Sequence, residues 1–522
     1  INAFSQIDNL YTQTLNKNEF VTRTYTDGTV IHQQTKRNRN THFLTLKSGF
    51  DWNVNEKNTF SFSTLYGLEK IIDNGEEPFF NEDYSQRTRL WQFLEDEVKT
   101  TFMASTSYQH KFRELGSFLN VNFNYTFHRE NEKYFFDNIL PSSSGTDAFK
   151  LLSDEKVSDL NIDYNKPLKH GKLESGLKFR YREIPTNMNF VPGTNSVLDA
   201  NAGGKATYKE IIPALYSNYN YENNKVQAEI GLRVEYVNLN YNVNPNHNTY
   251  KSDGYNYFQP FPNVRFTYKL NDKDRLSFFY NRRVDRPKEV DIRIFPKYDD
   301  AEIIKVGNPA LKPQYTNTFE VGYKKNLQNG YFYASLYHKM IHATITRIAT
   351  TDGSSNSNII YNVFQNAGNS NNTGTEIVFA NKFTDWYSYN VNTIFYYNEI
   401  KAFTVTNLYP TPSLYSTSKQ SIFSGNIKLN NNFKLSATFS GQVSMYYLAP
   451  EIVPQGKIQS RYAMDLGFKR IIQKGKGEIY LNATDVFNTL VTKSKYNGSN
   501  FNYTSNNYAE TQVFRIGYNY KF

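Results

Sequence analysis

The end of the chain alternates without interruption between apolar and polar side chains. In residues 514–522 the apolar positions are Phe514, Ile516, Tyr518, Tyr520 and Phe522, with polar residues or glycine between them. A β-strand with this pattern has one apolar and one polar face. A soluble fold would have to bury all of these side chains at its terminus, whereas a barrel in a bilayer presents them to lipid. The pattern therefore predicts a transmembrane strand.

The same alternation recurs along the chain and predicts an all-β protein. It is strict in residues 119–128 and 433–443. Near Tyr236 the apolar residues change from the even positions of 230–234 to the odd positions of 237–241, which predicts a β-bulge. No stretch has a helical period, and no apolar run approaches the length that a membrane-spanning helix needs.

Short polar segments with the composition of hairpin turns separate the alternating stretches. They are residues 16–19, 55–58, 113–116, 169–171, 222–225, 271–274, 327–330, 384–386, 430–432 and 473–477. Longer, irregular stretches are predicted at the opposite ends of the strands, at 73–96, 135–150, 187–204, 243–254, 287–312, 401–418 and 487–507. Short turns at the periplasm and long loops outside the cell are typical of an outer-membrane barrel.

The turns also predict the size of the barrel. They delimit about 21 strands, and since bacterial single-chain barrels have an even number, we expect one more strand before Ile1 and about 22 in the complete protein. A barrel of that size encloses a lumen that its own wall side chains cannot fill. Residues 1–522 read as barrel throughout, so we expect that a plug domain and the first strand are missing from this sequence.

Composition agrees with a wall that faces lipid on one side and water on the other. Only 39% of residues are apolar and the mean hydropathy is −0.66, yet 16% are aromatic. Such a chain is too polar for a helical membrane protein and too aromatic for a disordered one. There is no cysteine, which excludes disulfides and thiolate chemistry.

The net charge of +10 is spread along the chain, and its densest cluster, residues 36–39, is short. Nucleic acid is therefore not an expected partner. The basic residues fit a solvated loop or lumen face, or attraction to the anionic headgroups of outer-membrane lipid and lipopolysaccharide.

Several motifs resemble a known family. Residues 307–323, GNPALKPQYTNTFEVGY, are similar to the segment that enters a barrel strand in TonB-dependent receptors, although Gln314 stands where that family more often has Glu. The likeness is carried by Gly307, Asn308, Pro309, Leu311, Lys312, Pro313 and Glu320. Further segments resemble the Bacteroidota branch of outer-membrane β-barrels, namely 231–236, 261–264, 282–287, 366–376 and 482–488.

The resemblance implies a transporter in the bacterial outer membrane that takes up a scarce solute and is energised by a TonB-type protein. It also implies that Tyr518, Tyr520 and Phe522 are recognised by the barrel-assembly machinery. The alternative is a receptor-like barrel that serves as a structural subunit of a secretion or barrel-assembly complex, with surface lipoproteins or other outer-membrane proteins as partners. Neither hypothesis implies an enzyme or a cofactor.

Candidate ligand-binding residues are few. Arg282, Arg283 and Arg286 could hold an anionic ligand at the mouth of the barrel, although pairing with wall carboxylates or a plug is the simpler expectation. The loop aromatics Trp91, Phe93, Phe135 and Phe136 could stack on a ligand or pack the loops together. Asp299, Asp300 and Glu302 could hold calcium, but a solvated acidic run is the simpler expectation.

Overall fold

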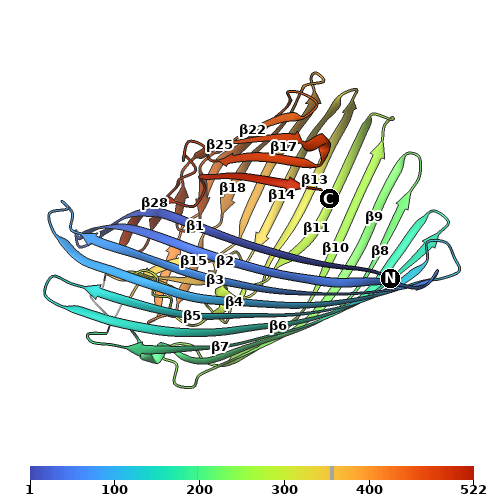
Figure 1. Ribbon diagram of the computed structural model, residues 1–522. Coiled ribbons are helices and arrows are strands. Elements are labelled where there is room, and N and C mark those ends of the chain that lie inside the picture. The colour runs from blue at the N-terminus through green and yellow to red at the C-terminus, as the bar shows by residue number, and fades with distance from the viewer. Residues whose placement is uncertain (197, 353–357, 522) are drawn as a thin grey trace.

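The computed structural model describes residues 1–196, 198–352 and 358–521, except for the side chain at position 16. One antiparallel sheet of 24 strands dominates it. In that sheet β23, β24, β27 and β28 belong to loops, and the other 20 strands form the wall of a barrel (Figure 1). The predicted class, an antiparallel transmembrane-type barrel, is confirmed.

The strands of the wall are, in chain order, β1 (Asn2–Tyr25), β2 (Val30–Asn55), β3 (Asn58–Phe80), β4 (Arg87–Lys111), β5 (Phe118–Ile139), β6 (Ser144–Leu168), β7 (Gly171–Pro192), β8 (Gly204–Glu222), β9 (Val226–Val243), β10 (Asp253–Lys269), β11 (Asp274–Asp285), β13 (Gln314–Leu327), β14 (Gly330–His342), β17 (Ser370–Lys382), β18 (Tyr387–Ile400), β21 (Gln420–Lys434), β22 (Phe439–Leu448), β25 (Arg461–Ile472), β26 (Gly477–Thr484) and β29 (Val513–Tyr520).

The remaining elements lie in the connections between wall strands. They are η1 (Ala200–Ala202), α1 (Glu289–Ile292), β12 (Ile303–Val306), β15 (Ile345–Thr351), β16 (Ile360–Asn366), β19 (Phe403–Asn407), β20 (Ser413–Thr417), β23 (Glu451–Val453), β24 (Gly456–Ile458), β27 (Thr492–Asn497), β28 (Phe501–Tyr508) and η2 (Gln473–Gly475). Among the described residues, no helix is both long and apolar enough to cross a membrane.

Eight of the ten predicted turns coincide with the short connections of one end of the barrel, the short-turn end. Two do not. Residues 16–19 lie inside β1, where the pairing with β2 shifts register between Thr14 and Lys17, so this polar segment is a bulge and not a turn. Residues 430–432 lie inside β21, and the turn follows at 435–438. Losing the first turn gives 20 wall strands instead of about 21, which removes the parity argument for a strand before Ile1.

The first ten wall strands are longer than the others. They contain 17 to 26 residues each, against 8 to 15 for the wall strands from β11 to β29. Figure 1 shows the blue to green strands reaching far past the shorter yellow to red ones. Two predicted long loops are consequently wrong: most of 73–96 and of 135–150 is strand, in β3, β4, β5 and β6.

The apolar face of these long strands changes sides partway along. On β5, Phe123 is exposed on the outside, whereas Tyr134 and Phe136, on the opposite parity, are buried on the inside. On β9 the outward residues end near Tyr236, and Val237 and Leu239 are buried inside. The pairing of β9 with β10 runs in unbroken register through this point, so the predicted bulge is wrong. The apolar residues of β9 change from even to odd positions because they point outward before Tyr236 and into the barrel after it.

The sheet curls far enough for its first strand to meet the loops of its last. Residues 18–25 of β1 pair with β28. In the described part of the chain, residues 2–17 of β1 pair only with β2, and β29 pairs only with β26. The ring is therefore closed by β28 at the end that carries the long loops, the long-loop end.

We predict that an arginine on the outer face destabilises the barrel more than one on the inner face. Leu481 points outward and its neighbour Asn482 points into the lumen. Leu481→Arg should lower the free energy of unfolding by about 2–4 kcal/mol, because it places a charge in the apolar layer, and Asn482→Arg should change it little. Denaturant titration of the barrel in lipid vesicles measures both. Equal effects would contradict the assignment of faces.

Candidate functional site in the barrel lumen

The connection between β11 and β13 folds into the lumen. We call residues 286–313 the lumenal loop; it contains α1, β12 and the GNPALKP segment. Most of its large apolar side chains are buried, with Ile294 at 2%, Ile304 at 2% and Leu311 at 1% exposed, whereas Val290 is exposed. They pack against inward aromatic side chains of the long strands, including Phe79, Trp91, Phe93, Tyr134 and Phe136. The loop and the wall thus share one hydrophobic core inside the barrel.

Ion pairs tie the beginning of the lumenal loop to the wall. The Arg293 guanidinium donates to Glu130 of β5 at 2.5 Å and to Glu289 of the loop at 2.6 Å. Lys297 lies 3.4 Å from a carboxylate oxygen of Glu132, also on β5. The cations of the loop thus pair with the negative charges of glutamates on the inner wall.

The rest of the loop is tied to β1, β2 and β4. Arg37 of β2 donates to the backbone oxygen of Asp299 at 2.7 Å. The side chain of Gln33 donates to Asp300 at 2.8 Å. Glu302 lies between two arginines, with nitrogen to oxygen distances of 2.6 Å to Arg23 and 2.9 Å to Arg89. The lumenal loop, which connects β11 to β13, therefore binds the sector of the wall formed by β1 to β5.

The prediction that the acidic run 299–302 is solvated is wrong, because Asp299 and Glu302 are paired with cations inside the barrel. Asp299 is 8% exposed, and it accepts from Lys305 at 3.1 Å. The nearby cations Lys305, Lys297 and Arg37 lower the pKa of Asp299 in spite of its burial. No group of three or more His, Asp or Glu residues among those described could hold a metal ion.

The GNPALKP segment forms the return arm of the lumenal loop. The Gly307 amide donates to the Arg293 carbonyl at 2.8 Å, and an added Cβ at Gly307 would lie 2.4 Å from that oxygen. Asn308 donates to the Phe364 carbonyl at 3.1 Å, which joins the arm to the next long loop. Glycine is needed at position 307 because the backbones of Gly307 and Arg293 lie too close together for a side chain between them.

Other long loops contact one another and the wall at the long-loop end. In the loop between β14 and β17, β15 and β16 form a small sheet with β12. The Gln455 side chain, from the loop after β22, both accepts from the Ala349 amide and donates to its carbonyl, at 2.6 and 2.8 Å. From the opposite wall, the Tyr25 hydroxyl donates to the Asn358 carbonyl at 2.5 Å. The loops of the short strands thus bridge to the long ones.

A cavity of about 660 Å³ lies between the wall and the start of the lumenal loop. On β5 it is lined by Thr126, His128 and Glu130, which precede the residues that hold the apolar core, so it lies on the short-turn side of that core. Most of its charges are paired, for example Arg180 with Asp159 at 2.8 Å. Its remaining lining residues are Ser153, Glu155, Val157, Arg182, Glu210, Arg286, Pro287, Lys288, Glu289 and Val290.

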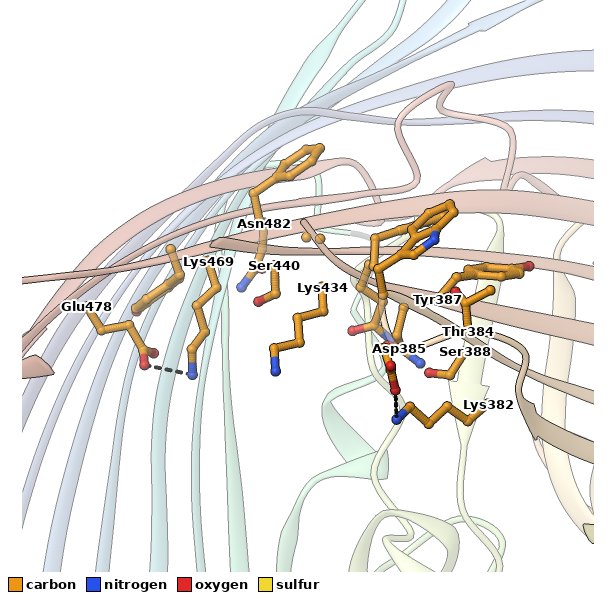
Figure 2. Close-up of a pocket in the computed structure, with 18 of the residues that line it drawn as sticks. Lys382, Thr384, Asp385, Tyr387, Ser388, Lys434, Ser440, Lys469, Glu478 and Asn482 are labelled. Atoms are coloured by element: carbon orange, nitrogen blue, oxygen red, sulfur yellow. Dashed lines mark hydrogen bonds and ion pairs between the residues drawn. The ribbon is translucent and has the colours of Figure 1, made fainter. Parts of the chain in front are cut away.

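A second cavity, of about 930 Å³, lies on the inner wall near the short-turn end. Figure 2 shows Lys382 directed at Asp385 and Lys469 directed at Glu478, with Lys434 between the two pairs. Lys434 forms no ion pair with any described residue, and Arg515 also lines this cavity. The surface carries more basic than acidic groups and could hold an anion or an acidic protein segment.

The structure separates the predicted candidate residues. Arg286 pairs with Glu235 of the wall, Arg282 lies over the Tyr315 ring at 5.0 Å, and Arg283 is exposed. They do not converge on one point.

Trp91, Phe93 and Phe136 are buried in the hydrophobic core that the lumenal loop shares with the wall, where their rings contact other rings. Phe135 is 47% exposed on the outside. Tyr518 and Tyr520 lie on the outward face of β29, and Phe522 lies outside the described residues. No local pattern identifies the glutamates that bind the lumenal loop, because their partners are distant in the chain.

Comparison with known proteins agrees with this architecture. The model of the outer membrane protein beta-barrel family matches residues 110–520. A search of the curated proteins finds no match. Similar solved structures include the copper transporter OprC, with a TM-score of 0.53 and 11% identity over 96% of this chain and 80% of that one.

Two further structures are iron receptors. The ferric-catecholate import receptor Fiu of E. coli K12 has a TM-score of 0.53 and 10% identity over 95% of this chain and 82% of that one. The pyoverdine-bound FpvA of Pseudomonas aeruginosa has a TM-score of 0.54 and 10% identity over 94% of this chain and 71% of that one. At these identities the likeness shows the fold alone. The neighbours are receptors and transporters and not enzymes.

We predict that Gly307→Ala weakens the docking of the lumenal loop. The added methyl group would meet backbone atoms that cannot move aside, at a cost of about 1–3 kcal/mol. Gly67→Ala is the matched control, because its Cβ would meet nothing closer than 3.7 Å. Limited proteolysis should cut residues 286–313 faster in the first variant only. Unchanged cleavage in Gly307→Ala would show that the close approach is not required.

We also predict that acid loosens the mouth through His247, in the loop between β9 and β10. Burial lowers the pKa of His247 to about 4, from an ordinary value of 6.5. Below pH 6.5 the released loop would bind a proton that the docked loop does not, so docking is most stable above pH 6.5 and weakens as the pH falls toward 4. Hydrogen exchange of residues 244–252 between these limits should show this. In His247→Gln the same exchange should depend less on pH.

Proposed function

The chain belongs to the outer membrane protein β-barrel family, and from this premise we propose that it is the barrel of a TonB-dependent receptor that imports a solute. Membership places it in the bacterial outer membrane, with the short-turn end at the periplasm and the long loops outside. The motif resemblance stated above and the likeness of fold to metal and siderophore receptors both support import. The assignment to the Bacteroidota branch stays a prediction.

The observation that carries this proposal is the lumenal loop, which is buried against the inner wall at the long-loop end. A passive pore needs an open passage, whereas here the lumenal loop is buried against wall strands from β1 to β9. In this proposal a solute that follows this part of the lumen displaces that loop. Import through such a barrel needs a ligand or an energised partner to shift the loop, because a buried ion-pair network does not open by itself at low cost.

Two partners follow from the proposal. The basic cavity of Figure 2 faces the lumen near the periplasm, where a plug domain and its TonB-type partner would act. The chemistry of that surface fits an acidic side chain or segment of the plug. The alternative function, a structural subunit of an assembly or secretion complex, is favoured by none of these observations.

Energy dependence tests the proposed function. A deletion strain complemented with the gene should take up radiolabelled iron, supplied as a catechol chelate, or copper faster than the uncomplemented strain. A protonophore or loss of the TonB-type protein should abolish the difference. Uptake that persists under both treatments would identify a passive channel, and the absence of uptake for every chelate together with stable co-purification of other barrels would favour the scaffold.

We predict that fixing the lumenal loop to the wall stops import. The chain has no cysteine, so Arg293→Cys with Glu130→Cys places the only thiols at the ion pair between the loop and β5. A short bis-maleimide should reduce uptake by the double variant by at least about tenfold, because passage requires a loop movement. Each single variant treated with the reagent is the control. Full uptake by a chain shown by mass spectrometry to be cross-linked would mean that the loop need not move.

A further inference from the structure

One buried carboxylate in the lumen has no partner. It belongs to Glu210 of β8, which is 3% exposed and lines the cavity of about 660 Å³ between the wall and the start of the lumenal loop. Its side chain forms no hydrogen bond or ion pair with residues 1–196, 198–352 or 358–521. A buried charge is costly unless a cation or hydrogen-bond donors compensate it. Glu210 can therefore accept a donor that the described chain does not supply.

The cations around Glu210 are bound by other carboxylates. Arg182 stands directly opposite Glu210 in the register of β7 with β8. Its guanidinium nevertheless donates to Glu155 at 2.6 Å and to the Pro287 carbonyl at 3.3 Å. Two further arginines attract Glu210, and each binds a different acidic residue; these pairs are Arg180 with Asp159 and Arg286 with Glu235.

The cavity suits an organic cation better than a metal ion. In the described part of the chain, no three His, Asp or Glu residues are grouped so that they could hold a metal. The hydroxyl groups of Thr126 and Ser153 line the cavity together with Glu210, and Lys288 is exposed at its edge. An ammonium or guanidinium group donates several hydrogen bonds, so it can bind a carboxylate and hydroxyl oxygens at once. The volume is typical of small-molecule sites.

We propose that this cavity binds a protonated amine or guanidinium group through Glu210. One side of the cavity belongs to the lumenal loop, with Pro287 and Glu289. Glu289 also binds Arg293, so a cation in the cavity lies beside an ion pair of the loop that import must displace. The site itself follows from the wall and the loop. That the cation belongs to an imported solute, and not to a side chain of the plug, rests on the proposed function.

Isothermal titration of the purified protein in detergent with agmatine, which carries an amine and a guanidinium, tests the site. Glu210→Gln keeps the size of the side chain and removes its charge, so it should weaken binding by at least about tenfold. Glu210→Asp keeps the charge and should retain part of the affinity. The matched control is Glu478→Gln, in the cavity of Figure 2, which should bind as the wild type does. Heat-modified gel mobility confirms that each variant is folded.

Two results of the titration would overturn the proposal. Equal affinities of the wild type and Glu210→Gln would show that the surrounding arginines already satisfy this carboxylate. Equal binding of 1,4-butanediol, which has the same carbon chain and no charge, would show that the cavity does not select a cation.

Uptake by cells identifies the source of the cation. The two substrates are a trihydroxamate iron chelate with a free amine and the same chelate after N-acetylation. If the solute supplies the cation, Glu210→Gln should raise KM severalfold for the amine form only. An equal change for both forms would overturn the assignment to the solute and leave the cation to the plug. Absence of uptake of either form would contradict iron import but would not alter the titration with agmatine.

Discussion

The wall of this barrel separates two solvents, and the rest of the structure depends on where that separation ends. Within the apolar layer a strand must direct its apolar side chains outward and pair every backbone group. Beyond the layer both faces meet water, and apolar side chains are stable only if another part of the chain covers them. The long strands change faces at this boundary, from Phe123 outside to Tyr134 inside on β5. The inward core of the mouth is a consequence of that change.

The lumenal loop covers that core with apolar residues and binds the wall through charged ones, and the two kinds of contact have different consequences. Apolar packing of Ile294 or Leu311 gains free energy in proportion to the area buried. A buried ion pair such as Arg293 with Glu130 gains little net stability, because desolvation offsets most of the attraction, but leaving either partner alone is costly. The charges therefore fix where the loop docks more than how tightly it docks. A ligand or partner that supplied replacement charges could release it.

The class of fold can be predicted from the sequence because the alternation of apolar and polar residues is visible in neighbouring positions. The C-terminal strand and most turns needed only neighbouring residues to be recognised. Prediction failed where the meaning of a pattern depended on distant contacts. Residues 16–19 have the composition of a turn but belong to β1, which pairs with β2. The change of apolar parity near Tyr236 resembles a bulge, although it marks the edge of the apolar layer. Trp91 belongs to a strand and not to a ligand-binding loop, because the strands continue beyond the layer.

The lumenal site could not be located from sequence for the same reason. Arg293 and Glu130 are 163 residues apart in the chain, and either one alone looks like a solvated surface charge. The GNPALKP segment was recognisable as a motif, but its physical role became clear only from the close approach of Gly307 to the Arg293 backbone. That contact joins the return arm of the loop to Arg293, the residue that binds the wall. Movement of either segment must therefore displace the other. The lumenal loop is in this way coupled to β13, which follows the return arm and runs toward the periplasm.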